Sequence, residues 1–547
     1  MEISKPQKIK HRSWKKYLLN PNLLFFLALI VGSTGLAIIR AVRLQEITFP
    51  NVKIMSFTLP VFIQKLPLTN YAFLFFLLLA VILFYLTPPK LRWMPIVFFN
   101  TYFILGFGFQ TFIPLSITTL VSFFAAVVIS KQEGQKSKKL VMRIGNLLLI
   151  SMLFFYKYSI PMTWSIYKIF HTPVIDLLFP LGLSFYSFQA IAYITDVYTQ
   201  KRPVIKNFGL FYASLSFFPK FTAGPIVRGR EYIEEFIQPR KLDILQFQLG
   251  IVRIFWGISK KVILANRMLV ATNPVFANPL MLSSLETWIS IIFYSLYIYI
   301  DFSAYCDIAI GSAQLFGIQL TENFNRPYFA TSVQDFWQRW HITLSTWLND
   351  YIFQPLNFSS RRLKSKLLTI FHILIVFVIS GMWHGASITF ILWGTLHGLY
   401  QAIGHILSPI RNKFSAFIGI EENSLSSKLY RIPITFLLVT VTWIFFGTNS
   451  IGNIKTIFIN LAFQGESLFG FSIFNLGITQ PDLDIILIGL AVLFATELSS
   501  RKRNLFEVFV NLHFPLKLSL LLIFILVIIL LGQYQLSIVN NFVYDAF

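Results

Sequence analysis

The chain has 547 residues, of which 55% are hydrophobic, 17% aromatic and 13% charged. An ordinary soluble domain carries about 25% charged residues, so this composition excludes a soluble globular enzyme, a disordered protein and a disulfide-rich scaffold. The net charge of +23 would suggest nucleic-acid binding in a soluble protein. No basic stretch here forms a binding module, so we expect no nucleic-acid partner.

The apolar residues gather in segments of about 17–25 residues, the length that crosses a bilayer as a helix. The first segment, Leu23 to Ala41, follows a basic arm and is too long for a signal peptide. With it, about 13 crossings are predicted, near residues 23–41, 69–86, 93–111, 112–130, 141–160, 175–196, 245–268, 284–302, 367–382, 386–407, 432–447, 482–498 and 517–533. The sequence therefore predicts an all-α polytopic membrane protein that retains its first helix.

Basic residues indicate the orientation of these segments. Lys90 and Arg92 follow the second segment, Lys138 and Arg143 follow the fourth, and later even-numbered segments repeat the pattern. Basic loops stay in the cytoplasm, so we expect a cytoplasmic N-terminus in a multi-pass protein of the cell (inner) membrane, surrounded by the lipid bilayer. The single cysteine, Cys306, excludes an intrachain disulfide and a multi-cysteine metal site.

Three stretches, residues 206–243, 301–350 and 448–481, are neither apolar spans nor plain loops. The first two mix aromatic and charged residues with Gly and Pro. Such backbone is tolerated at membrane depth only where it is buried in protein or lies beside water. We therefore expect re-entrant segments and a functional site in these stretches.

Histidines are concentrated in one part of the chain. Burying an ionisable group in a membrane-spanning segment costs free energy, so each such histidine is a candidate for function. The alternative is a buried neutral histidine that only hydrogen-bonds a neighbouring helix. Five of the eight histidines lie within 65 residues, namely His341, His372, His384, His397 and His405.

His384 stands in the run SGMWHGA, residues 380–386. We expect the flanking glycines to leave room for a substrate beside the imidazole. A desolvated imidazole is neutral and can act as a general base. The alternative is a helix break with a packed histidine.

The run DFWQRWHITLSTWLND, residues 335–350, predicts one amphipathic, aromatic helix on the cytoplasmic side. On this helix Trp337 and His341 share a face, and Arg339 can pair with Asp335 at i, i+4. The alternative is an interfacial helix that lies on the membrane. His341 and His384 are too far apart in sequence to form a zinc box, so no metal site is predicted.

Two further motifs carry candidate residues. In the run FFPKFTAGPIVR, residues 217–228, Lys220 and Arg228 lie on either side of a Gly-Pro turn. They can meet an anionic group such as a phosphate or serve as snorkelling anchors. In the C-terminal tail FVYDAF, the phenol of Tyr544 can accept an acyl group if a base removes its proton, or the tail can be an aromatic anchor.

Together the motifs resemble the bacterial membrane-bound O-acyltransferases, and among them the alginate O-acetyltransferase type. The resemblance rests on the runs FFPKFTAGPIVR, ENFNRPY with DFWQRWHITLSTWLNDYIFQPLN, and MWHGASITFILWGTLHGLY. It covers about residues 179–407, the expected catalytic core, with N-terminal transmembrane helices at 1–178 and C-terminal helices plus the tail at 408–547. Lys220 departs from the family pattern, which has an uncharged residue there.

The resemblance implies a ring of about 11–13 transmembrane helices around a central funnel, with re-entrant helices. His384 corresponds to the family's catalytic histidine and His341 to its second motif histidine. Tyr544 matches the acyl-accepting tail pattern Phe-x-Tyr-x-x-Phe. The donor-orienting candidates are Trp337, Arg339, Trp383, Lys220 and Arg228.

The same resemblance implies an acyl thioester donor, acetyl-CoA in the alginate type, with no bound cofactor and no metal. A partner acetyltransferase outside the membrane would pass the group to a polysaccharide. A D-alanyl transferase, a lipid or protein O-acyltransferase and a transporter are the alternatives. A transporter would need paired charges at the midplane, with Asp301 and Asp307 as the main candidates.

Overall fold

The structure of the protein is a computed structural model. It describes residues 66–69, 71–170, 179–228, 236, 242–359, 366–417, 424–462, 473–500, 505–534 and 542. Within these residues all regular structure is helical, which confirms the predicted all-α class for the described part of the chain. The predicted first crossing at 23–41 lies outside the described residues.

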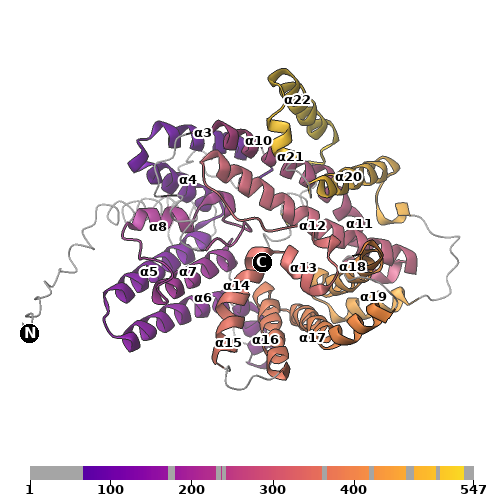
Figure 1. The fold of residues 1–547 in the computed structure, drawn as a ribbon, viewed down its shortest axis with the longest axis horizontal. Coiled ribbons are helices and arrows are strands. Elements are labelled where there is room, and N and C mark those ends of the chain that lie inside the picture. The colour runs from indigo at the N-terminus through magenta and orange to yellow at the C-terminus, as the bar shows by residue number, and fades with distance from the viewer. Residues whose placement is uncertain are drawn as a thin grey trace, which may run out of the picture.

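The described N-terminal helices form one side of the molecule (Figure 1). They are α3 (Tyr71–Leu86), η1 (Pro89–Leu91), α4 (Trp93–Gly106), α5 (Phe109–Lys131), α6 (Gln135–Phe170), α7 (Leu183–Tyr198), α8 (Phe208–Leu215) and η2 (Phe218–Lys220). The buried amide of Asn100 on α4 donates to the Ala213 carbonyl at 3.1 Å and accepts from the Phe218 N–H at 3.0 Å. This side chain thereby fixes the turn between α8 and η2.

The long helix α12 and the helix α10 packed along it form the next layer (Figure 1). The elements are α10 (Ile244–Ser259), the π-helix η3 (Lys260–Ala265), α11 (Asn266–Ala277), η4 (Pro279–Met281) and α12 (Ser284–Leu315). A capping box between Ser283 and Glu286 starts α12. At 32 residues, α12 is longer than the roughly 20 residues that a crossing needs.

Two buried ion pairs join η3 to α12. Lys260 Nζ lies 2.5 Å from Asp307 Oδ2, and Lys261 Nζ lies 2.6 Å from Asp301 Oδ1. These pairs explain how two adjacent lysines occur in a segment that the sequence predicts as apolar, because a buried charge requires a partner. A π-helical turn within a helix is itself common at functional sites.

The middle of the molecule holds short, broken elements (Figure 1). They are η5 (Pro327–Phe329), α13 (Val333–Arg339), α14 (Ile342–Leu348), the π-helix η6 (Asn349–Phe353) and α15 (Gln354–Ser359). The helical hairpin of α16 (Lys366–His384) and α17 (Ile388–Phe417) packs beside them. η5, α13 and α14 lie within the stretch 301–350, where a re-entrant segment stays a prediction.

The C-terminal helices complete the ring of helices around the short central elements (Figure 1). They are α18 (Leu425–Gly447), α19 (Ile451–Leu461), η9 (Ile473–Leu476), α20 (Gln480–Ser499), α21 (Leu505–Val510) and α22 (Phe514–Leu531). α20 and α22 pack against η3. α22 is mostly exposed, with Ile528 as its buried residue, as expected for a helix that faces lipid.

Six described helices are long and apolar enough to cross a membrane: α5, residues 135–159 of α6, α12, α16, α18 and α22. α3 is a shorter apolar helix. These helices support a multi-pass membrane protein. The total of 11–13 crossings stays a prediction.

Candidate active site

His384 is the last residue of α16, at the tight junction with α17. A Cβ atom at Gly381 would lie 3.0 Å from the Phe390 carbonyl carbon, and one at Gly394 would lie 3.1 Å from the Gly381 nitrogen. The expectation that glycines leave room for a substrate here is therefore wrong for Gly381. The absence of a side chain instead lets the two helix backbones approach closely, and that contact positions His384.

Two side chains of α6 bind the end of α16. Lys157 Nζ donates to the Trp383 carbonyl, and the Tyr158 hydroxyl donates to the Met382 carbonyl at 2.9 Å. The last carbonyls of a helix have no partner within the helix, so these bonds allow α16 to end at His384 inside the protein. Lys157 was missed from sequence, although a lysine within an apolar segment is itself a signal of function.

Aromatic rings surround the buried imidazole of His384. Its ring centroid lies 4.7 Å from that of Trp383, 5.0 Å from Trp393 and 5.2 Å from Phe446. The indole N–H groups of Trp383 and Trp393 are buried and make no hydrogen bond to another described residue. Buried donors normally have partners, so these two N–H groups can donate hydrogen bonds to an oxygen of a ligand or water.

His341 occupies the break between α13 and α14. It has a left-handed backbone with φ of 43° and precedes the first residue of α14. Its Nδ1 lies 3.2 Å from Asn323 Oδ1, which also accepts from the Thr343 N–H at 3.1 Å and from its hydroxyl at 2.9 Å. Burial lowers the pKa of His341, which lies outside the membrane-crossing helices, to about 3. Its ring is therefore neutral at physiological pH.

The prediction of one amphipathic helix over 335–350 is wrong at this break. At the break, the helix backbone bonds to the backbone of residues 323–325 instead of to itself. The Asn325 N–H donates to the Arg339 carbonyl, and the Ile342 N–H donates to the Asn323 carbonyl. Trp337 and His341 consequently lie on different elements. Both side chains are buried and face the protein interior.

Trp383 brings the two histidines into one site. Its ring centroid lies 6.2 Å from that of His341 and 4.7 Å from that of His384. Phe185 on α7 packs against both Trp383, at 5.6 Å, and His341, at 6.3 Å. Residues from α7, α14 and α16 thus form a buried aromatic site with two imidazoles.

The three predicted basic residues bind protein groups of their own. Lys220 is fully buried, and its Nζ donates to Gln189 Oε1 at 2.6 Å, which rules out snorkelling. Arg228 pairs with Asp350 at 2.5 Å. Arg339 pairs with Asp335 at 2.6 Å, which confirms the predicted i, i+4 pair.

Trp337 and the remaining histidines have distinct surroundings. Trp337 Nε1 donates to His397 Nδ1 at 3.2 Å, and Thr442 Oγ1 lies 2.9 Å from His397 Nε2. Both ring nitrogens of His397 are thereby used in joining helices. His372 lies 2.6 Å from Asn357, and His405 is exposed.

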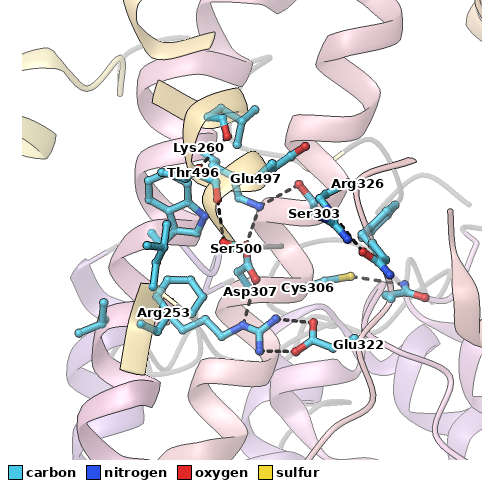
Figure 2. A pocket seen from close by; sticks show the side chains of 18 of the residues that line it. Arg253, Lys260, Ser303, Cys306, Asp307, Glu322, Arg326, Thr496, Glu497 and Ser500 are labelled. Atoms are coloured by element: carbon cyan, nitrogen blue, oxygen red, sulfur yellow. Dashed lines mark hydrogen bonds and ion pairs between the residues drawn. The ribbon is translucent and has the colours of Figure 1, made fainter. Parts of the chain in front are cut away.

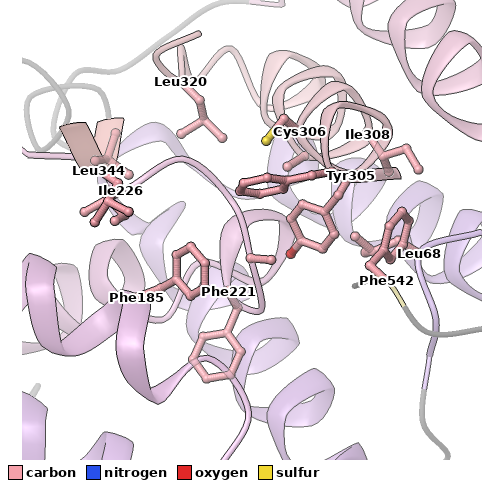
Figure 3. Close-up of a cluster of buried hydrophobic side chains, with 14 of the residues drawn as sticks. Leu68, Phe185, Phe221, Ile226, Tyr305, Cys306, Ile308, Leu320, Leu344 and Phe542 are labelled. Carbon is pink, nitrogen blue, oxygen red and sulfur yellow. The ribbon is translucent and has the colours of Figure 1, made fainter. Parts of the chain in front are cut away.

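Of the aromatic tail, the structure describes Phe542, and its predicted acyl acceptor Tyr544 lies outside the described residues. The Phe542 ring is buried, with its centroid 5.1 Å from that of Tyr305 on α12 (Figure 3). Lys261 Nζ lies 4.7 Å from the same centroid, a cation–π contact. This point of the tail is therefore packed in the protein interior rather than at its surface.

Among the described residues, no cluster of three or more His, Cys, Asp or Glu side chains could hold a metal ion. The chemistry that the aromatic site offers is acid–base chemistry on a buried imidazole with indole donors nearby.

Comparison with known proteins agrees with these features. The model of the membrane-bound O-acyltransferase family matches residues 108–418. The peptidoglycan O-acetyltransferase of Helicobacter pylori is 33% identical over 373 residues, which cover 63% of this chain and 69% of that protein.

Two other relatives align over shorter regions. A probable alginate O-acetylase of Pseudomonas aeruginosa is 35% identical over 272 residues, about half of each chain (49%). The teichoic acid D-alanyltransferase of Bacillus subtilis is 29% identical over 259 residues, 45% of this chain and 63% of that protein. The resemblance noted in the sequence is thus confirmed, and the chain belongs to the membrane-bound O-acyltransferase family, whose members are acyltransferase enzymes.

Proposed function

We propose that this enzyme transfers an acetyl group from a cytoplasmic thioester, acetyl-CoA, across the membrane for O-acetylation of an extracytoplasmic polysaccharide. The observation that carries the proposal is the pair of buried imidazoles, His384 and His341, that both contact Trp383. The relatives named for peptidoglycan and alginate acetylation favour an acetyl group and a polysaccharide.

In this proposal His384 is the general base. Its imidazole takes the proton of an acceptor hydroxyl while the hydroxyl oxygen attacks the thioester carbonyl carbon. The C–S bond breaks, and the thiolate leaves and takes up the proton from the imidazolium. General-base help supplies about 10²–10⁴-fold. The indole donors of Trp383 and Trp393 would stabilise the negative oxygen of the tetrahedral intermediate.

Tyr544 is the proposed first acceptor. The buried position of Phe542 supports this role, because two residues of extended chain span about 7 Å at most. In this scheme the packed Phe542 ring would limit how far the acceptor phenol can move away. A partner acetyltransferase outside the membrane would then move the acetyl group from Tyr544 to the polysaccharide.

The donor is oriented by His341 and its neighbours in this scheme. Asn323 holds the imidazole of His341 in place, and Trp337 and Trp383 supply aromatic walls. Arg339 and Arg228 would supply positive charge around the donor path, although each also pairs with a carboxylate. Lys220 would act from the interior, through its hydrogen bond to Gln189, because burial lowers the pKa of its ammonium. The enzyme would work as a multi-pass protein of the inner membrane.

The test is release of free CoA thiol from acetyl-CoA by the purified full chain. We expect His384→Ala to abolish release above the hydrolysis background. His405→Ala is the matched control, because His405 lies on the adjacent helix and is exposed. Full CoA release by His384→Ala, or none by the wild type with its acceptor present, would overturn the proposal.

A further inference from the structure

A cavity lined by both charged and apolar side chains lies between α10, α12 and the C-terminal helices α20–α22 (Figure 2). Its volume is about 630 Å³. Its lining combines charged side chains with apolar ones, among them Leu493, Phe509 and Phe524. The cavity can therefore receive a molecule that is polar at one end and apolar at the other.

The cavity is lined by as many basic as acidic side chains, but not every one of them forms an ion pair. Arg253 pairs with Glu322 at 2.6 Å and with Asp307 at 3.0 Å, and Lys260 also pairs with Asp307. By contrast, Arg326 donates to the Asn325 side chain at 3.2 Å and takes part in none of the ion pairs among the described residues. A cation with an amide beside it is suited to a phosphate group.

Arg326 is also held in an unusual backbone conformation. Its φ of 50° is left-handed, a conformation that costs about 1 kcal/mol or more for a residue with a bulky side chain. Glu497 also lines the cavity, and its carboxylate accepts a hydrogen bond from the Tyr299 hydroxyl at 2.5 Å. The cavity thus offers a cation and a carboxylate to one headgroup.

An apolar groove continues from the cavity. It has a volume of about 210 Å³ and shares Trp256, Lys260, Leu493 and Phe524 with the cavity wall. Its other lining residues come mainly from η3, α20 and α22 and are almost all apolar, including Ile485, Ile488, Val492, Val527 and Leu531. From Leu493 to Ile485 the groove follows α20 for about 12 Å, close to the roughly 15 Å of hydrocarbon in one leaflet.

The cavity and the groove follow one another along α20 in the order expected for the headgroup and acyl chain of a lipid in the cytoplasmic leaflet. Thr496, Glu497 and Ser500 in the cavity lie at the end of α20 that precedes the basic run Arg501-Lys502-Arg503, which the charge pattern assigns to the cytoplasm. The groove lies toward the opposite end. A headgroup in the cavity would therefore face the cytoplasm, and its acyl chain would point toward the middle of the bilayer.

We propose that this cavity and groove bind one zwitterionic phospholipid of the phosphatidylethanolamine type. Its phosphate binds Arg326, its ammonium binds Glu497 and one acyl chain fills the groove between α20 and α22. An acetyl thioester has no long acyl chain to fill the groove, which is why the lipid fits better than the donor. Asn323 lines the cavity and also contacts His341, so the lipid would lie next to the aromatic site.

The test is the phospholipid content of the full chain purified in detergent, measured by lipid extraction and mass spectrometry. We expect about one phosphatidylethanolamine per chain, and about tenfold less in Arg326→Asn, because one charge-assisted bond is lost. Asparagine tolerates the left-handed backbone. Val492→Trp should fill the groove and lower the content similarly, whereas Leu487→Trp, on the same helix but outside the groove, should retain the lipid.

Equal lipid content in all four proteins would overturn the proposal. Retention of an anionic phospholipid in place of phosphatidylethanolamine would overturn the headgroup assignment. Displacement of the lipid by added coenzyme A would show that the cavity belongs to the donor, and would also overturn the proposal. Because the readout is bound lipid and not turnover, its failure leaves the acyl-transfer proposal intact.

Discussion

The aromatic site around His384 and the polar cavity around Arg253 hold their polar groups in opposite ways. At His384, Trp383, Trp393 and Phe446 enclose an imidazole among apolar rings. In the cavity, Arg253 is bound by two carboxylates. The first arrangement shields the imidazole from water, and the second stabilises charge by pairing. Substitutions in the first should therefore change turnover, and those in the second should change stability or bound ligand.

The largest effect is expected from His384→Ala. Loss of the general base should lower CoA release by about 10²–10⁴-fold, with an unchanged elution volume in size-exclusion chromatography. His405→Ala should retain wild-type release. A loss of less than about tenfold would remove His384 from the role of base.

His341→Asn should lower kcat by about a hundredfold, because the donor is no longer held in line with the acceptor. Asparagine is chosen because it adopts the left-handed backbone that His341 has at φ 43°. Steady-state kinetics with varied acetyl-CoA would separate kcat from KM. Wild-type kcat in this variant would contradict a role for the imidazole itself.

Lys157→Met should lower kcat by about tenfold, since it removes the hydrogen bond to the Trp383 carbonyl beside His384. Lys157→Arg should restore most of the rate, and KM for the donor should stay near the wild-type value. A change in KM alone would place Lys157 on the donor path instead of in support of α16.

The smallest effect is expected in the cavity. Glu322→Gln should lower the free energy of unfolding by about 0.2–1 kcal/mol, as for an exposed ion pair, because the Glu322 side chain is 58% exposed and Arg253 keeps Asp307. Denaturation followed by tryptophan fluorescence, at low and high salt, would measure it, and salt should reduce the difference. A loss of several kcal/mol would mean that the cavity depends on Glu322 as strongly as on a buried pair.

Local patterns in the sequence predicted much of this architecture. The apolar segments anticipate most described helices, and the spacing of Asp335 and Arg339 anticipates their ion pair. The break at His341 was not predictable, because its cause is the backbone of Asn323 and Asn325, distant in sequence. The ion-pair partners of Lys260 and Lys261 were likewise not predictable from sequence, since Asp307 and Asp301 lie on another helix.

The glycines beside His384 show the same limit. From sequence, Gly381 is equally consistent with space for a substrate and with close helix packing. Only the position of Phe390 on α17 decides for packing. Residues whose role depends on a distant segment are thus the ones that local sequence patterns assign least well.

The most direct test of the central claim is mass spectrometry of the C-terminal peptide after incubation of the full chain with acetyl-CoA. The account predicts an acetyl group on Tyr544 in the wild type and none in His384→Ala. Phe542→Ala should reduce the acetylated fraction, because it removes the packed ring that anchors the tail. An unmodified Tyr544 in a wild-type protein that releases CoA would contradict the acyl-carrier step, and equal acetylation in His384→Ala would contradict His384 as the base.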